Sequence, residues 1–311
     1  MKAFFPDGKH HKSMSYLVGL LCLLLYLPTR VYSQQDEAAY FKELYKPVHH
    51  TISETNAFIL ERIEMEGADT RFPFLHFRQK AANEIRYVIL LHEIDGSKNN
   101  WNESEARIPM HSTLRDSLLN LGFNLLIPDL KFHGERASEL PGRTPSSLHP
   151  ANVESLDDAS MFYRLLADSK VDINYMMNYI SSSHGPARFD LIGVGIGGSI
   201  AIQVAYTDNR VSRVVAINTD LREPYASAED KDWPDDDKSF FMEVTPGYAL
   251  EEISQQVLLL YDHAKQLKTD SISSDQSFKL SENNRLNYDK NLTEKEIVHI
   301  LGWLQNKSKK E

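Results

Sequence analysis

The sequence predicts an α/β fold in which a mostly parallel central sheet is flanked by helices. Short apolar runs of strand length alternate with longer segments in which apolar residues recur at helical spacing. Several runs are apolar at almost every position, which is typical of strands buried on both faces of a sheet. One run, at 189–194, ends in a group of glycines and passes directly into a helical pattern. Alternating strands and helices of these lengths favour a parallel sheet covered on both sides.

Length and composition are those of an ordinary globular protein. The chain has 311 residues, of which 41% are hydrophobic and 25% charged. These values allow one large domain or two small ones. We find no internal repeat and no interdomain linker, so we expect one α/β domain over residues 57–305, followed by a polar tail at 306–311.

The first 33 residues have the pattern of a secretory signal peptide. Basic residues precede an apolar run at 16–27, Pro28 interrupts it, and small residues Val31 and Ser33 suit a cleavage site. The run is shorter than the roughly 20 residues that a membrane-spanning helix needs. We therefore expect cleavage near Ser33 and a periplasmic or secreted protein. An uncleaved segment is the alternative, and is the only membrane attachment that we expect.

Removal of residues 1–33 would change the chemistry open to the protein. Cys22 is the only cysteine, so the mature chain would have no disulfide, thiol nucleophile or thiolate metal site. The removed segment holds four basic residues and one acidic residue, so the formal net charge would change from −10 to −13. Such a charge repels phosphate backbones, and we expect no nucleic-acid partner.

The N-terminal half predicts these elements in order. Residues 34–56 are polar, with apolar residues at helical spacing before Pro47, and we expect a helical lead-in. Strands are expected at 58–66, 72–77, 85–92 and 123–129, with a helix within 104–121 that stops at Gly122.

The C-terminal half continues the alternation. A long helix is expected at about 153–183, with a break at 168–172 as an alternative. After the glycine turn and its helix, we expect strands at 211–218 and 256–262, a short strand at 278–280 and a closing amphipathic helix at 293–304. The polar, acidic stretch at 221–252 is expected to form a loop or lid.

Two interpretations of the glycine turn predict different functions. Gly193, Gly195 and Gly197 fit the nucleophile elbow G-x-S-x-G with glycine in place of serine. Gly193, Gly195 and Gly198 instead fit the dinucleotide fingerprint G-x-G-x-x-G, and Asp220 lies where a ribose-binding acid would be expected. The late position of the turn and the predicted export disfavour dinucleotide binding.

The order of motifs resembles the α/β-hydrolase superfamily. The run ending in Leu90-Leu91-His92 precedes the segment at 122–135, which contains Asp129 and His133-Gly134, and then the glycine turn at 193–198. Glu93 and Glu135 depart from the family pattern, which usually has glycine and a small hydroxyl residue there. In its predicted export and its altered elbow, the chain also resembles an uncharacterised proteobacterial group, DUF3530.

The resemblance implies positions for a Ser-His-acid triad, and this chain lacks two of them. Gly195 has no nucleophile, and Ser199 lies inside the helix as a packing residue. The loop at 281–291, where the family histidine is expected, contains none, and His299 lies within the closing helix. Asp262 follows its strand at the place of the triad acid, so a residual acid is the remaining candidate.

These observations predict an exported α/β-hydrolase-fold protein without serine-hydrolase activity, which acts by binding a small anionic ligand or a protein partner. His92, Glu93, Gly195 and the backbone N–H of Ile196 form the hypothetical ligand site, since a helix N-terminus favours anions. The alternative is a hydrolase that uses unconventional residues, with Asp262, His92 and His133 as candidates. A dinucleotide-binding enzyme is the third possibility.

The sequence predicts no cofactor and no metal site. It has no P-loop, no His-Glu-x-x-His pattern and no paired thiols. The acidic run at 229–237 lacks the spacing of a calcium-binding loop, and Pro234 interrupts it, so we expect a solvated loop. His133 is expected to support loop structure, as its counterpart does in the family.

Overall fold

The computed structural model of the chain describes residues 43–80, 86–102, 109–149, 152, 155–221, 244–250, 252–261, 285–287 and 293–305. Several predictions lie outside these residues: the signal peptide at 1–33, the tail at 306–311, the strand at 278–280 and the acidic run at 229–237.

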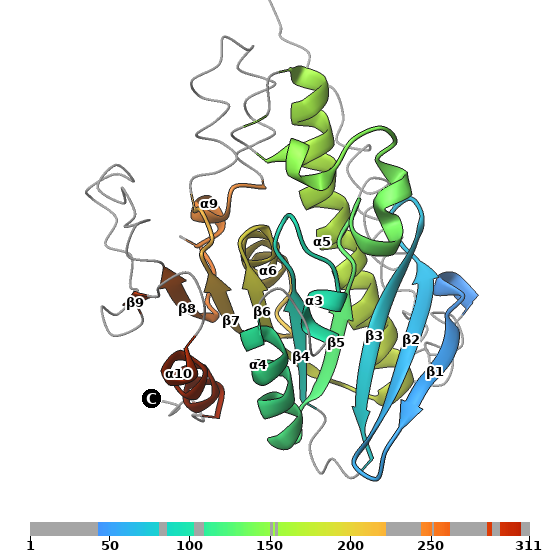
Figure 1. The fold of residues 1–311 in the computed structure, drawn as a ribbon, viewed down its shortest axis with the longest axis vertical. Helices are drawn as coiled ribbons and strands as arrows, with labels where there is room; N and C mark the ends of the chain where they lie inside the picture. The colour runs from blue at the N-terminus through green and yellow to red at the C-terminus, as the bar shows by residue number, and fades with distance from the viewer. Residues whose placement is uncertain are drawn as a thin grey trace, which may run out of the picture.

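A nine-stranded sheet forms the centre of the fold, in the spatial order β1-β2-β3-β5-β4-β6-β7-β8-β9 (Figure 1). The strands are β1 (Val48–Glu54), β2 (Phe58–Glu66), β3 (Arg71–Gln79), β4 (Arg86–Leu91), β5 (Asn124–Pro128), β6 (Arg188–Val194), β7 (Val211–Ile217), β8 (Gln256–Tyr261) and β9 (Arg285–Asn287). The first four strands in this order, β1, β2, β3 and β5, pair antiparallel with one another. All pairs from β5 to β9 are parallel. The predicted mostly parallel sheet is confirmed.

Helices cover both faces of this sheet (Figure 1). They are α3 (Asn99–Asn102), α4 (Pro109–Asn120), α5 (Leu156–His184), α6 (Ile196–Thr207), α9 (Pro246–Leu250) and α10 (Glu294–Gln305), with 3₁₀ turns η1 (Gly134–Glu139) and η2 (Pro145–Leu148). Side chains of α5 and α6 form one core layer, and those of α4 and α10 form the other. No helix among the described residues is long and apolar enough to cross a membrane.

Helix α5 is continuous, without the break considered at 168–172. It begins with a capping box, in which the hydroxyl of Ser155 accepts from the Asp158 N–H and the Asp158 carboxylate accepts from the Ser155 N–H. Asp168 and Asp172, which suggested the break, instead project from the helix toward buried basic side chains. Their pairing explains why a helix with these residues remains intact.

The expected helical lead-in at 34–56 is only partly helical. Residues 43–45 are helical, but Val48–Glu54 forms the edge strand β1, whose seven residues are all exposed. It pairs antiparallel with β2, with a register shift between Thr51 and Ser53. Pro47 separates the two conformations. Pairing with β2 determines the strand conformation of Val48–Glu54, because an exposed polar segment has little hydrophobic pattern of its own.

The crossover from one side of β4 to the other positions the site. Helix α4 leads from β4 to β5 on one side, and α5 leads on to β6 on the other. Leu91 at the end of β4 pairs with Gly193 on β6, so the turns after both strands lie side by side. Such a reversal of strand order opens a crevice at the carboxyl ends of the strands.

Candidate functional site: the glycine turn between β6 and α6

The turn between β6 and α6 has the backbone of a nucleophile elbow. Strand β6 ends at Val194, α6 begins at Ile196, and Gly195 alone connects them with φ 54° and ψ −117°. Residues with a Cβ rarely adopt such a conformation, which costs about 1–3 kcal/mol. A side chain at position 195 would project from a sharp strand-to-helix turn, as the nucleophile of an α/β-hydrolase does.

The other glycines of this turn are required by close packing. A Cβ at Gly193 would overlap the backbone of Gly197, and a Cβ at Gly198 would overlap the hydroxyl of Thr219. A Cβ at Gly197 would come within 2.7 Å of the His92 carbonyl oxygen. The role of these three glycines is therefore to let α6 pack against the ends of the neighbouring strands.

Gly195 differs, because a Cβ there has room. Its nearest neighbour would be the Glu93 Cβ at 3.6 Å, an ordinary van der Waals contact. Among the described residues nothing blocks a Cβ here, so backbone strain is the local reason for glycine that the described part of the chain provides. Position 195 therefore has the backbone and the space for a projecting side chain, and glycine supplies none.

Strand order assigns this turn to the hydrolase type of site. A dinucleotide fingerprint follows the first strand of its nucleotide-binding unit, in the strand order 3-2-1-4-5-6. Here the glycines follow the sixth strand in the chain, and the first three strands are antiparallel. The order β2-β3-β5-β4-β6-β7-β8-β9 is that of an α/β-hydrolase sheet, with β1 as an added edge strand.

Glu93 lies over the elbow. Its carboxyl group turns away toward α3, where Oε1 accepts a hydrogen bond of 2.8 Å from the Asn100 side-chain amide. The other oxygen, Oε2, is buried without a hydrogen-bond partner. Burial raises the pKa of Glu93 above its ordinary value. Two of the positions that differ from the family pattern therefore lie side by side: Gly195, which has no side chain, and Glu93, whose Cβ lies next to it.

His92 is fully buried, and the backbone engages both of its ring nitrogens. Nδ1 lies 2.8 Å from the Glu93 carbonyl oxygen and therefore donates, and Nε2 accepts from the Leu130 N–H at 3.2 Å. Burial, aided by His133, holds the pKa of His92 well below its ordinary value. Neither ring nitrogen is free for a ligand in this arrangement, and the side chain joins the loops that follow β4 and β5.

His133 is also buried between backbone groups. Its ring nitrogens lie 2.6 Å from the Lys131 carbonyl oxygen and 2.7 Å from the Ile94 carbonyl oxygen. Burial lowers its pKa below the ordinary value. The expected structural role of His133 fits these contacts, since they hold the loop at 129–135 against the loop after β4.

Asp129 organises the same loop from beneath. Its carboxylate accepts hydrogen bonds from the backbone N–H of Lys98 at 2.9 Å and of Glu135 at 3.0 Å, and it pairs with the Lys98 ammonium group. A Cβ at Gly134, where φ is +54°, would overlap this carboxylate. The Asp129 and His133-Gly134 motif therefore shapes the loop beside the elbow.

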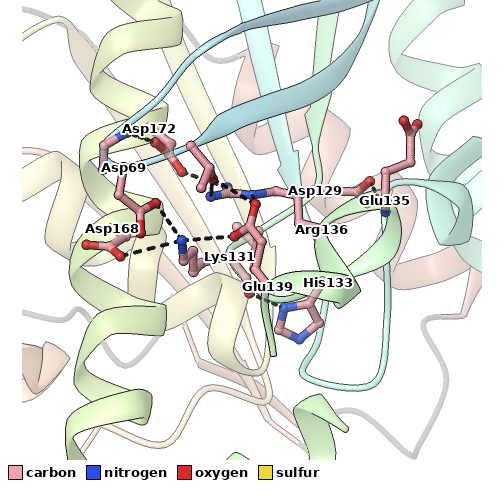
Figure 2. A network of polar contacts seen from close by, with 12 residues as sticks. Asp69, Asp129, Lys131, His133, Glu135, Arg136, Glu139, Asp168 and Asp172 are labelled. Carbon is pink, nitrogen blue, oxygen red and sulfur yellow. Dashed lines mark hydrogen bonds and ion pairs between the residues drawn. The ribbon is translucent and has the colours of Figure 1, made fainter. Parts of the chain in front are cut away.

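Next to this motif lies a buried charge network that the sequence did not predict (Figure 2). Lys131, which is 1% exposed, contacts Asp69 at 2.5 Å and Glu139 at 2.9 Å. Arg136, which is 2% exposed, contacts Asp172 at 2.7 Å and Glu139 at 3.1 Å. The network joins the β2–β3 turn, the loop after β5 and α5. Two basic residues flanking the His-Gly motif were its only sequence signal.

Three further residues were considered for the triad: Asp262, His299 and Ser199. Asp262 is the first residue after β8 and lies outside the described residues. His299 lies on α10, which covers the sheet face opposite to α6, and the last turn of α10 is held by Arg86 and Arg213 at the beginnings of β4 and β7. That end of the sheet is opposite to the elbow. Ser199 is buried within α6, as expected for a packing residue.

A polar depression lies on the same side of the sheet as the elbow. Its volume is about 640 Å³, and it is lined by Gly142, Arg143, Thr144, Ser147, Asn152 and Asp158. Ser146 beside it donates a hydrogen bond to Asp95 in the loop after β4. The described residues contain no group of three His, Cys, Asp or Glu side chains arranged to hold a metal ion.

Several solved structures are similar to this chain. The acetyl xylan esterase 1 of Thermoanaerobacterium sp. is similar with a TM-score of 0.53 at 11% identity, over 74% of this chain and 78% of the esterase. An acetyl xylan esterase from Paenibacillus sp. (TM-score 0.48, 13% identity, 78% and 84% covered) and an α/β serine hydrolase homologue from Coxiella burnetii (0.46, 14%, 82% and 98%) are also similar.

Together with the strand order, the first of these similarities shows that this chain has the α/β-hydrolase fold. No protein-family model matches the sequence, and no curated protein matches it. At identities this low, the similarity concerns the fold alone. The DUF3530-like resemblance remains a prediction.

Proposed function

We propose that this chain is an exported α/β-hydrolase-fold protein without serine-hydrolase activity, which binds a small anionic ligand or a protein partner at the elbow. The predicted signal peptide supports export. The negative charge of the chain argues against a nucleic-acid partner. Membrane attachment would require an uncleaved N-terminal segment.

One observation carries this proposal: Gly195 keeps the elbow backbone and has room for a side chain, yet has none. Acyl transfer through this fold needs a nucleophile there and a histidine to take up its proton. His92 and His133 are engaged by backbone groups, and α10 carries His299 on the other face. The sequence of the loop at 281–291 contains no histidine.

The decisive experiment is direct labelling. We expect the purified mature protein to resist a serine-directed fluorophosphonate and to hydrolyse no member of a panel of chromogenic esters above a boiled control. An active serine hydrolase of the same fold serves as the positive control. Labelling or turnover by the native protein would contradict the proposal.

An enzyme that uses unconventional residues is the second candidate, with Asp262, His92 and His133 as the residues singled out by the sequence. The structure adds Glu93, because a buried carboxyl group of raised pKa beside the elbow suits acid–base chemistry. Ester turnover without fluorophosphonate labelling, abolished by Glu93→Gln, would support this candidate. A dinucleotide enzyme would instead bind NADH, which intrinsic and NADH fluorescence would detect.

The proposed ligand site consists of Glu93, Gly195 and the start of α6. The first N–H groups of a helix have no acceptor within the helix, and the helix dipole favours an anion there. Methanesulfonate is a suitable probe because it stays charged at all relevant pH values. We expect the Ile196 amide to shift in an NMR titration with this anion and not with neutral dimethyl sulfone. An unshifted Ile196 amide would contradict anion binding at the elbow.

The charge of Glu93 should make this binding depend on pH. A charged Glu93 repels an anion, and the raised pKa of this carboxyl group means that it loses its charge earlier as the pH falls. Affinity for methanesulfonate should therefore increase toward low pH in the native protein. Glu93→Gln, which is uncharged and keeps an oxygen toward Asn100, should remove most of this dependence. An unchanged pH profile in the variant would show that Glu93 does not face the anion.

A further inference from the structure

A second group of titratable side chains lies away from the elbow, beside the edge of the sheet. We call it the histidine cluster: His49 on β1, His76 on β3 and His184 at the end of α5, around Glu61 on β2. Glu61 and His76 are direct partners in the antiparallel register of β2 and β3. The histidine cluster therefore joins four elements that are far apart in the sequence.

His76 is the unusual member of the histidine cluster. Its side chain is 0% exposed, and neither ring nitrogen has a hydrogen-bond partner among the residues that the structure describes. It packs between Tyr87 and His184, with ring centroids 5.8 and 5.5 Å away. A buried polar group without a partner costs about 1–3 kcal/mol, so such a position calls for an explanation.

Glu61 is the acidic centre of the histidine cluster, and its contacts are loose. Its carboxylate lies 3.7 Å from the His49 Nδ1, 3.9 Å from the His76 Nδ1 and 3.8 Å from the Arg78 Nε. These distances are longer than hydrogen bonds and allow charge attraction. Arg78 already supplies one positive charge, so each proton taken up by a histidine adds a positive charge beyond the one that Glu61 can balance.

The neighbours of His76 resist its protonation in the closed structure. The groups that face it are His49 from β1, Glu61 from β2, Arg78 from β3, Tyr87 from β4, and His184 from α5. Burial, with His184, Arg78 and His49, holds the pKa of His76 well below its ordinary value. Burial and Arg78 also lower the pKa of His184.

Strand β1, which carries His49, is weakly attached at the edge of the sheet. All residues of β1 are exposed, and among the described strands β1 pairs only with β2. His49 attaches it to α5 through a 2.7 Å hydrogen bond between its Nε2 and the Tyr179 hydroxyl, and Glu54 pairs with Lys80 at 2.6 Å. Without the contacts of His49, the contacts to described residues that hold β1 would be mainly its pairing with β2 and the Glu54–Lys80 ion pair at its other end.

We propose that the histidine cluster is a proton-operated switch, which holds β1 and the last turn of α5 on the sheet at neutral pH and releases them when its histidines take up protons. Release lets His76 reach water and moves His76 and His184 away from the positive charge of Arg78. It also exposes the edge of β2, whose backbone groups can then pair with another strand. The switch is independent of the function proposed for the elbow.

The direction of the effect follows from proton linkage. In the opened state His76 and His184 have ordinary pKa values near 6.5, and in the closed state their pKa values are lower. Below about pH 6.5 the opened state binds more protons, so the opening equilibrium should increase about tenfold per pH unit for each histidine that is protonated only on opening. Above pH 6.5 it should not change.

Hydrogen exchange measured by mass spectrometry on the full chain tests the switch. Exchange is followed at pH 7.5, 6.5 and 5.5 and corrected for the intrinsic chemical rate. Peptides over β1 and over 179–184 should lose protection about tenfold or more between pH 6.5 and 5.5, while peptides over β6 should not. Equal pH dependence of β1 and β6 would overturn the proposal.

His76→Phe is the decisive variant, because phenylalanine fits an aromatic environment and no hydrogen bond of His76 is lost. It should reduce the acid-dependent loss of protection in β1 by about tenfold per pH unit, which is the share of His76, and leave the share of His184. His111→Phe is the matched control, since His111 is equally buried but stacks on Trp101 on the other side of the sheet, and it should retain that loss. Retention of the full pH dependence in His76→Phe would overturn the proposal.

His184→Gln carries the same test if circular dichroism shows that His76→Phe does not fold. The half-buried His184 contributes through the proton that it takes up on opening. Glutamine takes up no proton, so His184→Gln should reduce the pH dependence of β1 opening by about tenfold per pH unit. An unchanged pH dependence in a folded His184→Gln protein would also overturn the proposal.

Discussion

At the scale of single residues, Gly193 and Gly195 lie two positions apart in one turn but are glycine for different reasons. Gly193 is in contact with the backbone of Gly197, where no Cβ fits. Gly195 has space for a Cβ, but its φ of +54° strains any residue that has one. Only Gly195 can be replaced by a residue with a Cβ while the present backbone stays in place.

The two positions should therefore respond differently to the same change. Gly195→Ser should fold and lose about 1–3 kcal/mol of stability, because of backbone strain alone. Gly193→Ser should lose about 3 kcal/mol or more, because α6 must move away from the sheet. Urea unfolding monitored by circular dichroism measures both. Equal losses would show that the space around Gly195 is not as open as the contacts indicate.

A serine introduced at position 195 should not produce ester turnover. Gly195→Ser supplies a hydroxyl group, but His92 and His133 remain bound to backbone groups and cannot take up its proton. We expect ester turnover no higher than that of Gly195→Ala, which carries the same strain without a hydroxyl group. Higher turnover in Gly195→Ser would reveal a general base at the elbow and would support the hydrolase alternative.

His111 allows a test of how burial affects a single histidine. Burial lowers its pKa to about 4, while an unfolded histidine titrates near 6.5. Above pH 6.5 His111 is neutral in both states and has no effect; as the pH falls from 6.5 to 4 the unfolded state takes up the proton first. The free energy of unfolding should therefore fall toward pH 4 by on the order of 3 kcal/mol more than in His111→Phe. Unfolding curves of both proteins at a series of pH values measure this difference, and parallel pH profiles would contradict it.

At the scale of elements, α5 owes its position to buried ion pairs as well as to its apolar face. Asp172 receives Arg136 at 2.7 Å and the Ala68 backbone N–H at 2.6 Å, so one carboxylate joins α5 to the β2–β3 turn and the loop after β5 (Figure 2). Burial raises the pKa of Asp172, and Arg136 opposes this effect. The pair is needed because each member would otherwise be a buried, unpaired charge.

Breaking this pair should be costly. Arg136→Met leaves Asp172 buried without its partner and should reduce the free energy of unfolding by about 3–5 kcal/mol. Arg164→Met is the control, because the Arg164 side chain is 45% exposed and its pair with Asp69 should contribute less than about 1 kcal/mol. Chemical denaturation measures both values. The double change Arg136→Met and Asp172→Leu should recover part of the loss, and similar losses in the two single variants would contradict the argument.

At the scale of the whole molecule, burial decreases from the centre of the sheet to its β1 edge. Strands β5 and β6 are buried at nearly every position and lie between two helical layers, whereas every residue of β1 is exposed. Amides of β5 and β6 should therefore exchange only through global unfolding, and those of β1 through local opening. Hydrogen exchange at pH 7.5 measures this gradient, and protection of β1 equal to that of β6 would contradict it.

The whole fold also shows which elements are visible in a sequence. The strands at 58–66, 85–92, 123–129, 189–194 and 211–218, the helix after the glycine turn and the closing helix were predicted from apolar periodicity and agree with the structure within a few residues. β1 was not predicted, because its exposed residues carry no apolar pattern and its pairing partner alone makes it a strand. The same limit applies to the charge network, in which Lys131 contacts Asp69 from 62 positions away.

The sequence by itself determined the α/β class, the order of the motifs and the absence of a side chain at Gly195, because periodicity, chain order and residue identity are local properties. Only the tertiary structure decided why that glycine differs from its neighbours, that the backbone engages His92 and His133, and that His49, His76 and His184 meet around Glu61. These facts depend on which distant segments pack together, and strand pairing and helix packing set those contacts after the local elements have formed.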